Sequence, residues 1–68
     1  MDGKLPRLTA SELIKVVEKA DFRLVRKSGS HMIYKNVKGL RIVIPFHRGK
    51  ILHSKIVKTA FKMIKRKE

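Results

Sequence analysis

The hydrophobic residues of this chain follow a helical period near both ends and alternate with polar residues in the middle, and this pattern predicts its elements. The first helix should begin after Thr9, which forms a Thr-x-x-Glu capping box with Glu12. It should stop at Asp21, because Asp tolerates the left-handed backbone that often ends a helix. The second helix should begin near Ser54, a residue type favoured as an N-cap. The apolar stripes are Ala10, Leu13, Ile14, Val17 and Ala20 in the first segment, and Ile56, Val57, Ala60, Phe61 and Ile64 in the second.

Three short segments of alternating character, residues 22–27, 31–36 and 40–44, are predicted strands. The first connection is Ser28-Gly29-Ser30, and the second runs from Asn36 to Gly39, the two residues expected there to take positive φ. Pro45 should end the third strand because it has no N–H to donate to a sheet. Such short connections favour an antiparallel three-stranded meander.

The element order α-β-β-β-α predicts a two-layer α+β sandwich in which both helices cover one face of the sheet and the other face stays open. A chain of 68 residues is too short for two cores, so residues 1–68 should form one domain with an ordered core of about 9–66. In the middle strand, His31 and Lys35 share one face with Ile33. Met32 and Tyr34 carry more apolar area, so we expect them to face the helices and His31 to face outward.

Charge narrows the class of partner. The chain has 18 Lys and Arg residues against 5 Asp and Glu, a formal net charge of +13. The lysine-rich surfaces of heat-adapted proteins usually balance Lys with Glu, so a polyanion is the favoured partner, ahead of an acidic protein or a membrane surface. The chain has no cysteine, which agrees with a cytoplasmic location, and no segment is apolar enough to span a membrane.

His31 is the main candidate for chemistry, because an unperturbed imidazole can take and give a proton near neutral pH. RNA cleavage without metal needs such a group and cations for the phosphate, which Lys27, Lys35 and Arg41 can supply from neighbouring strands. The few carboxylates do not provide the cluster that a two-metal mechanism requires. The residues by themselves favour a histidine that only stabilises the turn, and they leave catalysis open.

The other polar residues near His31 also allow more than one role. Ser28 and Ser30 lack an acidic partner for a catalytic triad, so we expect them to shape the turn and to donate to phosphate, with Gly29 aiming His31. In the basic loop after the sheet, His47 can contact a substrate or a protein partner, or stabilise the loop, and His53 is expected to begin the second helix. The histidine spacing does not favour a zinc site.

The segments Gly29-Ser30-His31-Met32-Ile33-Tyr34-Lys35 and Ile44-Pro45-Phe46-His47-Arg48-Gly49-Lys50, in this order of elements, resemble the HicA toxins. The resemblance covers residues 9–66 and also includes the start of the first helix, Ser11-Glu12-Leu13-Ile14-Lys15. It departs from the family at Asp21-Phe22, where a Gly-aromatic pair is usual, and at Ser54-Lys55-Ile56, where the helix often opens with Gly-Thr-Leu.

The resemblance implies a double-stranded-RNA-binding-domain-like fold, a HicB-type antitoxin partner and His31 as the catalytic residue of an mRNA interferase. We therefore expect a metal-independent endoribonuclease toxin without a cofactor, monomeric or bound to its antitoxin. A non-catalytic double-stranded-RNA-binding module, or a small basic nucleoid or ribosomal protein, remains the alternative. The residues expected to contact RNA are Lys27, Ser28, Gly29, Ser30, Lys35, Arg41, His47, Arg48 and Lys50.

Overall fold

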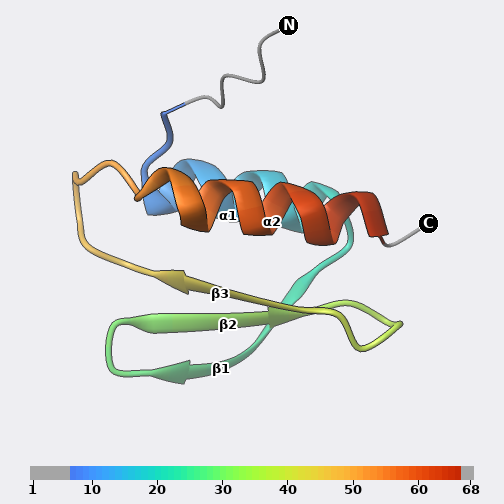
Figure 1. Cartoon of the computed structure of the whole chain (residues 1–68). Coiled ribbons are helices and arrows are strands. Elements are labelled where there is room, and N and C mark those ends of the chain that lie inside the picture. Colours follow the sequence, from blue (N-terminus) through green and yellow to red (C-terminus); the bar gives the residue numbers. More distant parts are fainter. Residues whose placement is uncertain (1–6, 67–68) are drawn as a thin grey trace, which may run out of the picture.

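The computed structural model describes residues 7–66 and has the predicted α-β-β-β-α order (Figure 1). The sheet is antiparallel with strand order β1-β2-β3, which confirms the meander, and each strand lies within one residue of its predicted bounds. Neither helix is long and apolar enough to cross a membrane within the described residues. The elements are α1 (Ala10–Lys19), β1 (Arg23–Ser28), β2 (His31–Lys35), β3 (Arg41–Pro45) and α2 (Ser54–Arg66).

The capping box at the start of α1 is confirmed. The Thr9 Oγ1 accepts a hydrogen bond from the Glu12 N–H at 3.3 Å, and the Glu12 Oε1 accepts from the Thr9 N–H at 2.9 Å. At the other end of the helix, Asp21 takes φ 70, the left-handed conformation that was expected of it. Local sequence therefore determines both ends of α1.

The prediction of Ser54 as the N-cap of α2 is wrong, because His53 fills that position. The His53 Nδ1 accepts from the Lys55 N–H at 3.0 Å, and its carbonyl oxygen accepts from the Ile56 N–H at 2.9 Å. Nδ1 stands at the same position along the side chain as the oxygen of Asn, one of the preferred N-cap residues. The expected role of His53 at the helix entry is confirmed, and Ser54 is the first helical residue.

The second connection also differs from its prediction. Gly39 has φ 83, as expected, but Asn36 does not take positive φ. Its side chain shapes the turn instead, because the Asn36 Oδ1 accepts from the Lys38 N–H at 3.0 Å and from the Leu40 N–H at 2.9 Å. Asn thus acts here as a hydrogen-bond acceptor for the local backbone, which is its other common role in turns.

The two helices lie side by side over one face of the sheet, and β1 is the strand farthest from them (Figure 1). All six residues of β1 are exposed, whereas Tyr34 on β2 and Ile42 and Ile44 on β3 are buried beneath the helices. The inward orientation of Tyr34 and Met32 is confirmed. The buried core consists of Ala10, Leu13, Val17, Ala20, Phe22, Tyr34, Ile42, Ile44, Leu52, Val57 and Ala60.

Removal of the cap at α1 should be measurable. We expect Thr9→Ala to lower the free energy of unfolding by about 1 kcal/mol, because the Glu12 N–H loses its acceptor. Urea denaturation followed by circular dichroism measures this. Ser11→Ala, at an exposed position of the same helix, is the matched control and should change stability by less. Equal effects of the two variants would contradict the assignment.

Tyr34 predicts a pH dependence. Burial raises the pKa of the Tyr34 phenol above its usual value of about 10, and the negative charge of Glu18 raises it further. Below about pH 10 the Tyr34 phenol holds its proton in the folded and in the unfolded chain, and its contribution to the free energy of unfolding is complete. At higher pH the unfolded chain releases the proton first, so this contribution is lost. In denaturation experiments between about pH 9 and 11, Tyr34→Phe should lose less stability than the unaltered chain. If the free energy of unfolding fell equally with pH in Tyr34→Phe and in the unaltered chain, the raised pKa of Tyr34 would be contradicted.

Candidate functional site

The candidate site lies on the face of the sheet opposite the helices, called the open face below. Residues that pair across neighbouring strands share a face, so the strand register arranges the open face in three rows. One row lies at the end of the sheet beside the β1–β2 turn, one in the middle, and one at the far end. The rows are Ser28–His31–Pro45, Arg26–Ile33–Val43 and Arg23–Lys35–Arg41.

A β-bulge in β1 decides which cations belong to this face. The register shifts between Leu24 and Arg26, so Val25 is an extra residue in the strand. Strict alternation would place Arg23 and Lys27 together, but the bulge brings Arg26 onto the face of Arg23 and turns Lys27 away. The adjacent apolar residues Leu24 and Val25, which interrupt the alternation, are the sequence signal that would have indicated the bulge.

Lys27 consequently lies on the opposite side of the sheet from His31. It pairs with Met32 and lines a hollow of about 240 Å³ together with Met32, Phe46 and the turn residues Gly29 and Ser30. Sequence reasoning expected Lys27 to supply charge beside His31 and missed Arg26. On the open face Arg26 is the diagonal neighbour of His31, a relation that places Cα atoms roughly 7–8 Å apart.

His31 is the first residue of β2 and is exposed. Gly29, in the turn before it, has φ 58, the left-handed conformation that glycine adopts without strain. The Ser30 carbonyl accepts from the Phe46 N–H at 2.7 Å, which ties this turn to the loop that follows β3. Within the described residues the His31 ring makes no hydrogen bond. The backbone around it is therefore fixed on both sides while its ring faces solvent.

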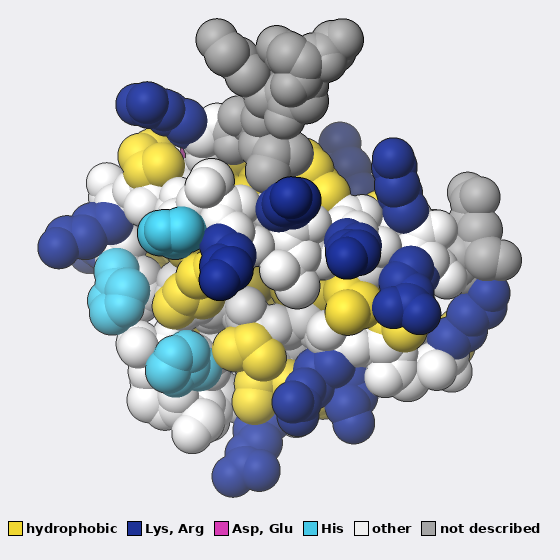
Figure 2. All heavy atoms as spheres, viewed as in Figure 1, with side chains coloured by type: hydrophobic (Ala, Val, Ile, Leu, Met, Phe, Trp, Pro, Cys, Tyr) yellow, Lys and Arg dark blue, Asp and Glu magenta, His cyan; other side chains and the backbone are white. Residues whose placement is uncertain are grey.

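The basic loop begins at the same end of the sheet. His47 follows Phe46, and its carbonyl accepts from the Lys50 N–H at 3.1 Å in a turn where Gly49 has φ 75. His47, Arg48 and Lys50 are all exposed. Figure 2 shows the three histidine side chains gathered along one end of the molecule. No group of three His, Asp or Glu side chains among residues 7–66 is arranged to hold a metal ion.

Lys35 and Arg41 do not lie beside His31. They stand at the other end of the open face, four residues along β2, a separation of about 13 Å at the usual rise of a strand. The structure thus divides the expected RNA-contacting residues. The β1–β2 turn and the basic loop lie at the His31 end of the sheet, Lys27 lies on the other face, and Lys35 and Arg41 lie at the far end, away from a phosphate held at His31.

Electrostatics favour anions over the whole open face. The three strands contain no Asp or Glu, and the carboxylates of residues 7–66 belong to α1 or follow it directly, at Glu12, Glu18 and Asp21. Lys and Arg side chains also spread over the side seen in Figure 2, where few acidic side chains are visible. A phosphate approaching the sheet therefore meets positive charge, and no carboxylate of the three strands competes with it.

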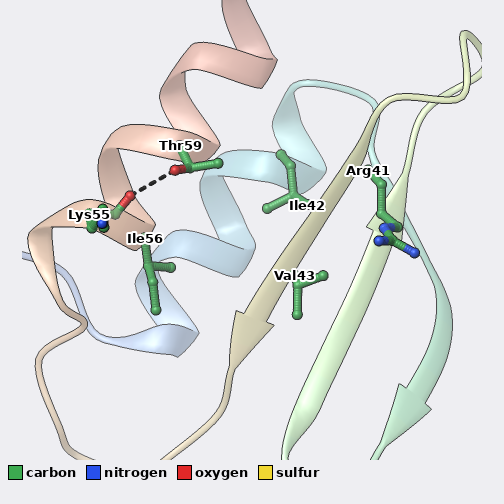
Figure 3. A pocket seen from close by; sticks show the side chains of 6 residues that line it. All are labelled: Arg41, Ile42, Val43, Lys55, Ile56 and Thr59. Atoms are coloured by element: carbon green, nitrogen blue, oxygen red, sulfur yellow. Dashed lines mark hydrogen bonds between the residues drawn. The ribbon is translucent and has the colours of Figure 1, made fainter.

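A groove of about 340 Å³ lies between α2 and β3, next to the open face (Figure 3). Ile42 points toward the helices, whereas Arg41 and Val43 lie on the other side of the strand (Figure 3). The Thr59 hydroxyl donates to the Lys55 carbonyl at 2.9 Å, so its proton is used within the helix. The groove offers an apolar floor with Arg41 and Lys55 at its rim and no catalytic group.

Residues 10–65 match the family model described as the HicA toxin of bacterial toxin–antitoxin systems. No curated protein and no solved structure matches the chain. The matched span runs from the start of α1 almost to the end of α2 and so includes the whole sheet with the open face. The chain therefore belongs to the HicA toxin family of bacterial toxin–antitoxin systems.

Proposed function

We propose that this HicA-family toxin is an endoribonuclease that cleaves mRNA without a metal ion and uses His31 for proton transfer. The observation that carries the proposal is an exposed imidazole, held by backbone hydrogen bonding on both sides, on a face that has cations and no carboxylates. Membership of the HicA family supports RNA as the substrate. His31 is then the catalytic residue.

In the proposed reaction the 2′-oxygen of a ribose attacks the adjacent phosphorus while the bond from phosphorus to the 5′-oxygen breaks. The products are a 2′,3′-cyclic phosphate and a free 5′-hydroxyl, so the 2′-proton leaves and the 5′-oxygen gains one. His31 performs one of these two transfers. Arg26 is the cation on the open face best placed to stabilise the negative charge that develops on the phosphate.

The turn and the basic loop complete the proposed substrate contacts. The Ser28 and Ser30 hydroxyls and the backbone at Gly29 can donate to phosphate next to His31. His47, Arg48 and Lys50 lie in the exposed loop that begins at the Ser30–Phe46 hydrogen bond. Lys27 would reach RNA only around the turn, from the other side of the sheet.

A HicB-type antitoxin is the proposed protein partner, and the cytoplasm, where mRNA is translated, is the proposed location. An antitoxin that covers the end of the sheet at His31 would block access of RNA to the reacting group. Its surface there is expected to be acidic, because the cations around His31 need charge complementarity in a stable complex.

Replacement of His31 tests the proposal. His31→Ala should lower the cleavage rate in EDTA by about 100-fold to 10,000-fold, because proton transfer by a positioned side chain contributes that much. Affinity for RNA should change little, since the ring faces solvent and supports no element. Cleavage of a labelled mRNA fragment and fluorescence anisotropy measure the two effects.

His53→Asn is the matched control, because Asn removes a histidine but keeps an N-cap acceptor for α2. It should cleave like the unaltered chain. Unchanged cleavage by His31→Ala would refute the catalytic assignment. Tight binding of duplex RNA without any cleavage by the unaltered chain would favour a non-catalytic binding module instead.

The bulge gives a second test, from two adjacent residues of equal charge. Arg26→Gln should lower kcat on the order of tenfold, less than the ~100-fold to 1,000-fold of a buried oxyanion-hole donor, because Arg26 is exposed. Lys27→Gln removes the same charge from the other face and should act on KM more than on kcat. Steady-state kinetics at fixed ionic strength compare them. A larger fall of kcat in Lys27→Gln would contradict the placement of the reaction on the open face.

A further inference from the structure

Three cations stand in register at the far end of the open face. Lys35 pairs with Arg23 on one side and with Arg41 on the other, so one positive charge lies on each of three adjacent strands. Like charges directly opposite one another destabilise a sheet, and neighbouring strands are only about 5 Å apart. We call Arg23, Lys35 and Arg41 the cation row.

Nothing within the described part of the chain neutralises the cation row. All three side chains are exposed, none of them forms an ion pair there, and the strands contribute no carboxylate. The core does not need these charges, because the row lies on the face turned away from the helices. An anion placed over the row would remove the repulsion between its members.

We propose that the cation row is a second phosphate subsite, which binds an RNA backbone phosphate a few nucleotides away from the phosphate held at His31. The proposal rests on the proposed function and adds a path for the substrate along β2. The distance of about 13 Å between the two ends of β2 separates the subsites, so one phosphate cannot occupy both.

The surface between the subsites favours single-stranded RNA over a duplex. Ile33 and Val43 occupy the middle row, and Val43 is 39 % exposed although it is apolar. A single strand can lay its unstacked bases and riboses on such a patch, whereas a duplex presents phosphates and 2′-hydroxyls and keeps its bases paired. An acidic protein segment would also match the charge, and the experiment below separates its binding from the binding of RNA.

Binding to oligoribonucleotides of different length tests the proposal. The probes are fluorescein-labelled single strands of two to about ten nucleotides with 2′-O-methyl groups, which lack the attacking hydroxyl and so report binding without cleavage. The variant is Lys35→Gln/Arg41→Gln. The control is Lys15→Gln/Lys19→Gln, which removes the same charge from exposed positions of α1.

We expect the row variant to weaken binding of the longest probe by roughly tenfold and to reduce the slope of log Kd against log salt by about 1 or more. Its affinity for the dinucleotide should equal that of the control, because so short a probe does not reach both subsites. Arg23→Gln should show the same length dependence with a smaller effect.

Equal loss of affinity at every length, or a loss no greater than that of the control, would overturn the proposal. The proposal would also be overturned if the row variant bound all probes normally but no longer bound an acidic antitoxin. The two proposals fail separately. If the unaltered chain cleaves no RNA but the length dependence holds, the subsite stands and the nuclease does not. If the chain cleaves RNA without any length dependence of binding, the nuclease stands and the subsite does not.

Discussion

The structure depends on the burial of one sheet face beneath two amphipathic helices. The apolar stripes of α1 and α2 are sufficient to cover Tyr34, Ile42 and Ile44, and residues 7–66 form no third layer over the other face. Burial of apolar area is the main favourable term in folding, so residues that face the helices are constrained to be apolar. The opposite face is free of that constraint, and His31, Arg26 and the cation row lie there.

The bulge at Val25 is a small change in the backbone, but it decides which charged side chains lie on the open face. One extra residue in β1 reverses the face of every residue after it, so Arg26 joins the open face and Lys27 leaves it. The hollow that Lys27 lines with Met32 and Phe46 lies on the side of the helices, but β1 extends beyond their cover. A strand at the edge, unburied on both faces, can accommodate a bulge without loss of core packing.

Charge in this chain is segregated. The described carboxylates are those of Glu12 and Glu18 in α1 and of Asp21 after it, and Glu12 belongs to the capping box. The charged residues of the three strands, in contrast, are all Lys or Arg, apart from His31. Repulsion within such a face lowers the stability of a small domain that has little buried area to spare. An anionic partner would relieve that repulsion, so the arrangement that weakens the free protein would strengthen a complex with the proposed RNA or antitoxin partner.

The sequence by itself determined the elements, their order and both ends of α1, because capping, helical period and turn residues act over a few neighbouring positions. It also predicted that His31 follows a tight turn and faces away from the helices, because Met32 and Tyr34 carry the larger apolar area, and the structure settled which face of β2 is buried. Tertiary structure decided the rest. Strand register and the bulge set which cations stand near His31 and which form a row about 13 Å away, and the backbone at the entrance of α2 selected His53 over Ser54 as the cap. These outcomes depend on pairing between segments distant in sequence and on local geometry that composition does not specify.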